Sequence, residues 1–309
     1  MQRRAFIKSA AALGAAAVAS QSMLSRVLAA PGAPAATPVS SVQGPDYYAD
    51  TMKAVELLGG MGRFVKPGST VGLLANVGSW LRIPGTYTRT DVVLATAQMA
   101  ADAGAKRIVF LLKVAPDLWS RSPLSAQHAA LTSSIGETAG TYVTREIPQG
   151  RAIKKADMIQ ELFECDVVIN LPIFKHHGGT MMTGCLKNVM GACSRSTNQF
   201  FHSGSTKPGA KEDLGFLAQA IADANLVRKA DLCVVDATEY LISNGPAGPG
   251  EMRKENRVLA GTDPVLIDCF GATLLGQNPA DIRTIRAAAA HGIGTTETGS
   301  CERREAVLA

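Results

Sequence analysis

The sequence has 309 residues, of which 46% are hydrophobic and 18% charged, which is ample material for one large buried core. The formal net charge is +5, but residues 1–30 hold four basic and no acidic residues, and their removal leaves 27 basic against 26 acidic residues. A chain so close to neutrality lacks the basic excess that nucleic-acid binding requires, so a nucleic-acid partner is excluded.

Residues 1–30 have the pattern of an export signal. Arg3 and Arg4 are followed by Phe6 and Lys8, then by an Ala-rich stretch too short to span a membrane and by small residues near position 29. The paired arginines resemble a twin-arginine signal. This predicts export by the twin-arginine translocase to the periplasm or another extracytoplasmic space, with no transmembrane segment in the mature chain. Because that route carries folded proteins, many of them loaded with a cofactor, it also favours a bound cofactor.

Residues 31–45 are rich in Pro, Ala, Ser and Gly, and we expect a disordered linker there. Residues 46–58 have the apolar spacing of an amphipathic helix that ends at Gly59 and Gly60. From residue 46 to residue 309 we expect a single domain.

Strand and helix patterns then alternate along the chain. Apolar β-rich runs predict strands and amphipathic runs predict helices, with Asp91 as an N-cap. The expected strands are 70–75, 107–114, 141–147 and 166–171, and the expected helices are 91–103, 123–135 and 159–164. This alternation is typical of a Rossmann-like α/β fold, that is, a mostly parallel sheet with helices on both faces.

The stretch from residue 170 to residue 202 holds three of the five histidines. Lys175, His176, His177, Gly178 and Gly179 follow the expected strand 166–171, where open α/β sheets bind their ligands. A single Lys or His in a loop is usually a solvated surface residue. Together, beside a Gly pair and a helix start whose free N–H groups suit a phosphate or carboxylate, these residues favour a site.

Residues 180–191 fit a helix with one apolar face. Its other face carries only small or hydroxylated residues and one lysine: Thr180, Thr183, Gly184, Lys187, Asn188 and Gly191. Such a face can accept a ligand closely. His202 follows Phe200 and Phe201, so it either caps an aromatic loop or serves the site.

Farther along, residues 203–212 form a Gly- and Ser-rich loop that we expect to be a mobile lid, and residues 214–224 form a helix. Asp236 ends the apolar strand 232–235 and, like Glu239, either lines the pocket or serves as a cap. Asp263 with Pro264 reads as a helix N-cap. Asp268 lies inside an apolar helix pattern, so its carboxylate needs a partner or a function.

Six cysteines occur, and an even count alone does not predict disulfides in so large a domain. Four lie in apolar patterns typical of small buried hydrophobes. Cys193 differs, because it lies in the 191–202 loop and is a candidate metal or cluster ligand with Cys185 or His202. His128 and His291 have no supporting neighbours and are expected to be surface or satisfied core residues.

The run D-V-V-I-N-L-P-x-x-K-x-H, then T-G-x-x-K-N-x-x-G and a later His, resembles the domain of unknown function 362 (DUF362) family. The resemblance continues in the motifs at residues 231–239, 244–249 and 261–268 and covers most of the chain from about residue 70. The family has no assigned activity. Some members carry a ferredoxin-like cluster module, whereas this chain has no C-x-x-C. Members often read K-P-N near residue 75, and of these only Asn76 carries over.

A more distant resemblance is to lactate-racemase-type enzymes with a nickel-pincer nucleotide. The order His177, Gly178-Gly179, Lys187, His202 is similar to their pattern of a His, a Gly-rich turn, a cofactor-tethering Lys and a metal-binding His. The resemblance implies that His177 is an acid/base, Lys187 the tether and His202 a nickel ligand.

These observations predict an exported, cofactor- or metal-dependent enzyme that performs proton or hydride chemistry on a small hydroxy or oxo compound. The cofactor candidates are a nickel-pincer-type nucleotide, another metal ion or an iron-sulfur cluster. One alternative is a non-catalytic iron-sulfur or redox-centre protein that serves a membrane partner; another is a pocket that binds a small anion without chemistry. The candidate residues are His177, His176 and Lys175 for catalysis, Lys187, Gly178, Gly179, Thr183, Asn188, Asp236 and Asn76 for cofactor binding, and His202 and Cys193 for metal.

Overall fold

A computed structural model describes residues 37–207 and 209–309. The predicted export signal lies outside the described residues. The predicted disordered linker at 31–45 is wrong over its second half, because strand β1 spans Pro38–Gln43. Val39 and Val42 of this strand are buried, and the strand pairs with two partners that lie more than 200 residues later in the chain.

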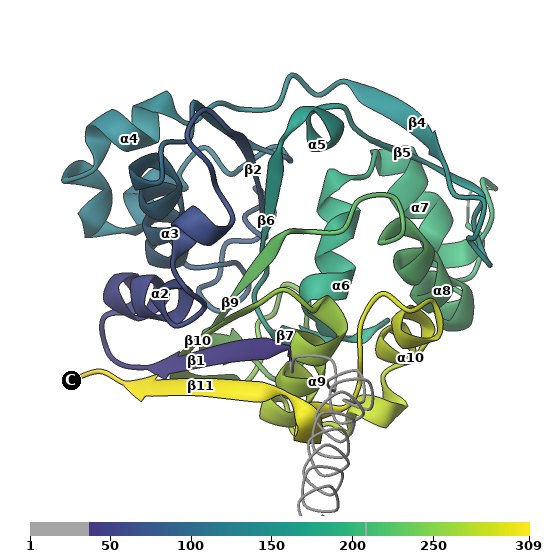
Figure 1. Ribbon diagram of the computed structural model, residues 1–309. Coiled ribbons are helices and arrows are strands. Elements are labelled where there is room, and N and C mark those ends of the chain that lie inside the picture. Colours follow the sequence, from purple (N-terminus) through teal and green to yellow (C-terminus); the bar gives the residue numbers. More distant parts are fainter. Residues whose placement is uncertain (1–36, 208) are drawn as a thin grey trace, which may run out of the picture. The chain divides into compact units, whose positions relative to one another are not determined.

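A seven-stranded sheet forms the centre of the fold, in the order β11-β1-β10-β9-β6-β2-β3 (Figure 1). Neighbouring strands of this sheet pair in parallel, except that β10 is antiparallel to both β1 and β9. The predicted α/β class with a mostly parallel sheet is therefore confirmed. The remaining strand bounds are β2 Thr70–Ala75, β3 Arg107–Phe110, β6 Val167–Leu171, β9 Leu232–Leu241, β10 Met252–Gly261 and β11 Glu302–Val307.

Helices cover both faces of the sheet (Figure 1), and each face buries its own apolar cluster. Burial of this apolar surface stabilises the fold at roughly 25 cal/mol per Å². On one face lie α2 Tyr47–Glu56, α3 Thr90–Asp102 and α4 Ala129–Ser134. The other helices of the described part are α5 Glu161–Glu164, α6 Cys185–Asn188, α7 Arg195–Ser203, α8 Leu214–Ala224, α9 Pro264–Leu274 and α10 Arg283–Ala290.

Aspartates begin several of these helices. Asp263 accepts hydrogen bonds from the backbone N–H groups of Val265 and Leu266, both at 2.9 Å, which confirms the predicted N-cap. Asp91 is not an N-cap as predicted. Helix α3 begins at Thr90, the residue before Asp91. The Asp91 carboxylate instead accepts a hydrogen bond from the Ser122 hydroxyl.

Several other elements differ from the sequence pattern, among them the helix expected at 123–135, which is a 3₁₀ turn at Pro123–Ala126 followed by α4. The strand expected at 107–114 ends at Phe110. The strand expected at 141–147, β4 Tyr142–Glu146, pairs with β5 Lys155–Ile159 in a separate antiparallel ribbon instead of joining the main sheet. The helix expected at 180–191 is replaced by a hairpin of β7 Lys175–His177 and β8 Met181–Thr183, followed by α6 and a 3₁₀ turn at Val189–Ala192.

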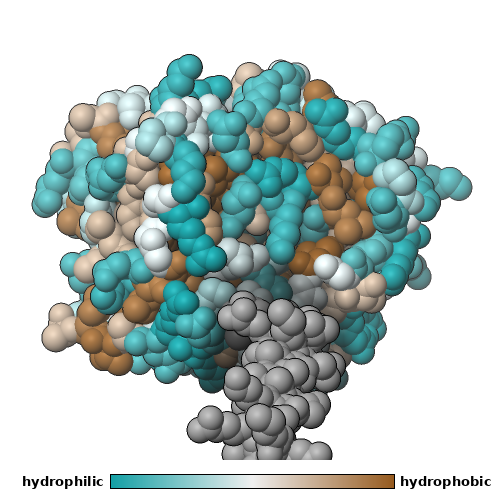
Figure 2. All heavy atoms as spheres, viewed as in Figure 1, coloured by the Kyte–Doolittle hydropathy of each residue, from teal (hydrophilic) through white to brown (hydrophobic). Residues whose placement is uncertain are grey.

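The face of the molecule drawn in Figure 2 mixes hydrophilic and hydrophobic residues over most of its area. Within the described ranges, no helix has the length and apolar character needed to cross a membrane.

Candidate functional site

A pocket of about 460 Å³ opens where β2 and β6 end, which is the edge of the sheet where the sequence predicts a site. Its walls come from the loop after β2, the β7–β8 hairpin, α6 with its following turn, and α7. Seven of the predicted site residues line it: Asn76, Lys175, His177, Thr183, Lys187, Asn188 and His202. Its volume falls in the range of ordinary small-molecule sites.

Lys175 reaches the pocket from strand β7 and is only 1% exposed. Its ammonium group donates a hydrogen bond to the backbone oxygen of Thr86 and lies 5.7 Å from the centre of the Trp80 ring. Burial, followed by repulsion from Lys187, lowers the pKa of Lys175 to about 7. This amine therefore changes charge close to neutral pH.

Lys187 lies on α6, with its ammonium nitrogen 3.7 Å from the Met190 sulfur. Burial lowers its pKa to about 8, against a smaller opposing effect of Glu212. Within the described part of the chain, neither Lys187 nor Lys175 has a carboxylate within 4.0 Å. Two lysines thus share one pocket, and neither has an ion-pair partner among the described residues.

His177 is 8% exposed, and its Nδ1 accepts hydrogen bonds from the backbone N–H groups of Gly179 (3.1 Å) and Thr180 (3.3 Å). Because Nδ1 accepts hydrogen bonds from two N–H groups, it carries no proton, and the proton of the neutral ring is on Nε2. Burial and the nearby lysines, first Lys187 and then Lys175, lower the pKa of His177 to about 3. His177 is therefore a neutral hydrogen-bond donor rather than a base with a pKa near 7.

The Gly pair does not form the anion-binding turn that the sequence suggests. The Gly178 N–H donates to the backbone oxygen of Gly245 (3.3 Å), and the Gly179 N–H is taken by His177. Both glycines line a neighbouring hollow instead. His176 also lies outside the pocket lining, and its Nδ1 accepts a hydrogen bond from the Gly245 N–H at 3.0 Å.

A row of asparagines fixes the floor of the pocket. The Asn188 amide donates to the backbone oxygen of Leu74 (2.7 Å) and to Oδ1 of Asn170 (2.8 Å). The Asn76 amide donates to Oδ1 of Asn188 (3.0 Å). Both amide donors thus have partners inside the protein, whereas the Oδ1 atom of Asn76 has no donor among the described residues.

Three buried polar atoms of the pocket have no hydrogen-bond partner within the described residues: Asn76 Oδ1, Thr183 Oγ1 and Asn198 Oδ1. An unpaired buried polar group costs about 1–3 kcal/mol, so a polar ligand that reached these three atoms would be stabilised by them. Sequence reasoning missed Asn198, because a single Asn in the polar helix α7 carries no pattern. Its amide is fixed by the backbone oxygens of Met190 and Cys193, at 2.9 and 3.2 Å.

The predicted metal ligands do not come together. His202 is half-exposed and pairs through Nδ1 with Glu212 at 2.5 Å. Cys193 lies outside the pocket lining, and burial raises the pKa of its thiol to about 12. Within the described residues, no group of three or more His, Cys, Asp or Glu side chains is arranged to hold a metal ion.

Asp236 has a structural role, one of its two predicted alternatives. It is fully buried in β9 and accepts hydrogen bonds from the Arg89 N–H (2.7 Å) and from the backbone and hydroxyl of Thr238 (2.9 and 2.7 Å). Asp268 has the partners that its buried position requires. It accepts hydrogen bonds from the backbone N–H groups of Cys185 (2.6 Å) and Leu186 (3.0 Å), and thereby holds the start of α6 and the position of Lys187.

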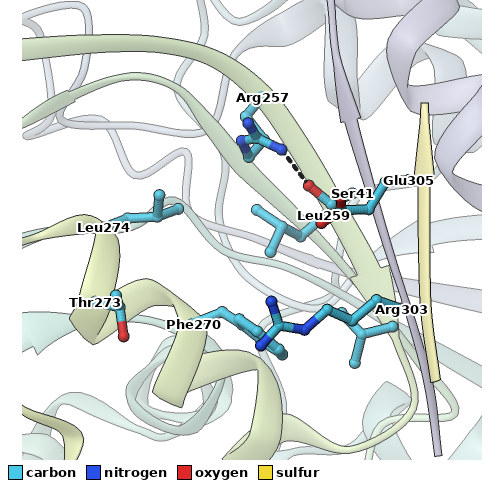
Figure 3. Close-up of a pocket in the computed structure, with 9 residues that line it drawn as sticks. Ser41, Arg257, Leu259, Phe270, Thr273, Leu274, Arg303 and Glu305 are labelled. Atoms are coloured by element: carbon cyan, nitrogen blue, oxygen red, sulfur yellow. Dashed lines mark hydrogen bonds between the residues drawn. The ribbon is translucent and has the colours of Figure 1, made fainter. Parts of the chain in front are cut away.

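A second hollow of about 220 Å³ lies between β1, β10, β11 and α9 (Figure 3). Its floor is apolar, and Arg257 and Arg303 project over it. The Arg257 guanidinium is already held by Ser41 (2.6 Å) and Gln43 (3.0 Å), and no predicted site residue lines this hollow. The lysine-lined pocket is therefore the candidate site.

The fold and the site together define an α/β protein with a mixed, mostly parallel sheet and a lysine-lined pocket at the carboxyl ends of its central strands. The chain belongs to the DUF362 family, described as "Domain of unknown function (DUF362)", whose model matches residues 71–273. It is 30% identical over 274 residues to the thylakoid-associated protein sll1697 of Synechocystis sp., a match that covers 84% of this chain and 80% of that protein.

Two solved structures are distantly similar. One is the lactate racemase apoprotein from Thermoanaerobacterium thermosaccharolyticum, with a TM-score of 0.47 and 10% identity over 76% of this chain. The other is a protein from Thermotoga maritima, with a TM-score of 0.38 and 11% identity over 79% of this chain. The chain spans 57% and 58% of their respective lengths. Likenesses this distant say nothing about activity.

Proposed function

We propose that this protein is an enzyme that binds a small organic anion with hydroxyl or oxo groups in the lysine-lined pocket and moves a proton, or a hydride when a cofactor is bound. One observation carries the proposal. The pocket joins two lysines that lack an ion-pair partner within the described residues to three buried polar atoms that lack a hydrogen-bond partner there. An anion that also carries hydroxyl groups stabilises both the charged lysines and the unpaired polar atoms.

Each group has a distinct task in this proposal. Lys187 holds the anionic group by charge. The Oδ1 atoms of Asn76 and Asn198 accept hydrogen bonds from ligand hydroxyls. His177 donates from Nε2 to an oxygen that gains negative charge. Lys175, whose pKa is about 7, gives or takes the proton, because a group that titrates near the working pH is the most effective acid or base.

A cofactor held by a covalent lysine linkage also fits the position of Lys187, which lines the pocket and has no ion-pair partner in the described residues. In that case Lys187 would be the tether and His202 the metal ligand, and a nickel-pincer-type group would supply the hydride chemistry. An iron-sulfur cluster does not fit these residues, because ordinary ligation takes four thiolates and the described residues bring no such group together.

The location of the protein is part of the proposal. The Arg3-Arg4 pattern supports export through the twin-arginine translocase to an extracytoplasmic space. The relative from Synechocystis is named for its association with thylakoids. A location at or beyond a membrane surface is compatible with both observations.

Binding tests the proposal directly. We expect ribose 5-phosphate, which has an anionic group and hydroxyls, to bind in calorimetric titrations, and ribose itself to bind far more weakly. Lys187→Ala removes binding, whereas Lys187→Arg keeps much of it, because a guanidinium also pairs with phosphate. Lys106→Ala, at an exposed lysine just before β3, is the matched control and leaves binding intact. The proposal fails if ribose 5-phosphate does not bind, or if both alanine variants lose affinity equally.

Intact mass separates the two roles of Lys187. A tethered cofactor adds mass to the peptide that contains Lys187 in protein made with its export pathway and nickel present, and Lys187→Arg abolishes the added mass. Loss of nickel with retention of the added mass in His202→Ala is specific to a tethered cofactor whose metal is held by that histidine. Unmodified mass in all preparations rejects the tether and leaves the anion-holding role.

A further inference from the structure

Trp80 lines the candidate pocket from the loop after β2 and is 60% exposed. Its neighbour Leu81 is only 2% exposed, and the loop is fixed by backbone bonds, among them Leu81 N–H to Gly78 oxygen (3.0 Å) and Ala115 N–H to Val77 oxygen (2.9 Å). The loop is thus anchored by its backbone, while the Trp80 ring remains exposed to solvent. An exposed indole on the wall of this pocket is a surface for a ligand with an apolar face.

The position of the ring is defined on two sides. A Cβ atom on Gly78 would lie 2.9 Å from the indole nitrogen, so the pyrrole edge rests against this glycine. The Lys175 ammonium lies 5.7 Å from the ring centre. The indole therefore stands beside one of the two lysines, within reach of any ligand whose anionic group they hold.

We infer that Trp80 stacks on a planar ring of the ligand, and that the pocket takes an aromatic anion with hydroxyl groups, of which a nucleoside monophosphate is the simplest example. The three parts of such a molecule match three parts of the pocket. The phosphate meets Lys187, the sugar hydroxyls meet the unpaired oxygens of Asn76 and Asn198, and the base lies on Trp80, beside Lys175. The phosphate part of this inference rests on the proposed function; the ring part rests on Trp80 alone.

The experiment compares AMP with ribose 5-phosphate, which lacks the ring, by calorimetric titration of the full chain. Stacking of a base on an aromatic side chain is worth roughly tenfold or more in affinity, so the wild-type protein binds AMP at least about tenfold more tightly than ribose 5-phosphate. Trp80→Ala reduces this ratio to about one. Trp80→Phe, which keeps a smaller ring, retains part of it and shows that the loop still folds.

Fluorescence gives an independent readout, because the chain has only two tryptophans. In Trp119→Phe the remaining emission comes from Trp80, and AMP quenches it whereas ribose 5-phosphate does not. Equal affinity of the wild-type protein for AMP and ribose 5-phosphate overturns the stacking role and leaves the proposed anion site standing. An unchanged ratio in Trp80→Ala also overturns it, because other residues then recognise the ring. If neither compound binds, both inferences fall.

Discussion

Asp50 allows a sharp test of how this fold responds to pH. Its side chain lies on α2, is 0% exposed and rests so close to Gly44 that a Cβ there would be 2.3 Å from the Asp50 carboxylate. Both carboxylate oxygens lack a hydrogen-bond partner within the described residues. Burial, followed by repulsion from Asp46, raises the pKa of Asp50 from 3.8 to about 6.

The direction in which pH changes the unfolding free energy follows from proton linkage. The folded state binds the Asp50 proton more tightly than the unfolded state, so the contribution of this group is most favourable below pH 3.8 and is lost as pH rises through about 6. One pKa unit corresponds to about 1.4 kcal/mol, so the full loss is up to about 3 kcal/mol, of which about 2 kcal/mol falls between pH 4 and pH 8. Asp50→Asn removes the titrating group and keeps the shape of the side chain.

We therefore expect the unfolding free energy of Asp50→Asn, relative to wild type, to increase by about 2 kcal/mol from pH 4 to pH 8. Urea denaturation at both pH values measures this difference, and any constant cost of the amide cancels. The exposed Asp102, at the end of α3, gives the matched control Asp102→Asn, which removes an exposed carboxylate instead of a buried one. An unfolding free energy of Asp50→Asn minus that of wild type that is the same at both pH values, or that is lower at pH 8 than at pH 4, would refute the assignment of a neutral buried acid.

Three further outcomes are expected. Affinity for ribose 5-phosphate falls as pH rises above about 7, because Lys175 and then Lys187, with pKa values of about 7 and about 8, lose their protons while the phosphate keeps its charge; calorimetry between pH 6 and 9 checks this, and a flat profile contradicts it. Gly184→Ala weakens the same binding and destabilises the fold by about 1–3 kcal/mol, because the new methyl group would lie 2.3 Å from the Asp268 carboxylate that holds α6; thermal and urea unfolding measure the loss. Arg3→Lys combined with Arg4→Lys keeps the protein in the cytoplasm, uncleaved; cell fractionation shows it, and unchanged export refutes the twin-arginine assignment.

The local sequence determined those elements whose signal lies within a few neighbouring residues. The strand Thr70–Ala75 and the helix Leu214–Ala224 have the predicted bounds, since the periods of two and 3.6 are properties of the segment itself. The cap at Asp263 and the need of Asp268 for partners also follow from single residues in recognisable contexts. The place of the candidate site followed as well, because strands of a parallel sheet end at one edge.

Tertiary structure decided what depends on distant partners. Residues 38–43 form a strand only because β10 and β11 pair with them, since the run P-V-S-S-V-Q has too little apolar character to indicate a strand by itself. The helical spacing at 180–191 gave way to the β7–β8 hairpin, where backbone pairing across the Gly178-Gly179 turn replaces local helical bonds.

The final composition of the pocket is likewise a long-range property. Asn198 and Trp80 are separated from Lys187 by 11 and 107 positions in the sequence, yet all three line one pocket. Cys193 lies in the same stretch as Lys187, but its side chain packs into the core. Sequence proximity placed residues in one neighbourhood, whereas the direction of each side chain was fixed by packing, because burial of apolar groups and pairing of polar groups are satisfied only in the folded chain.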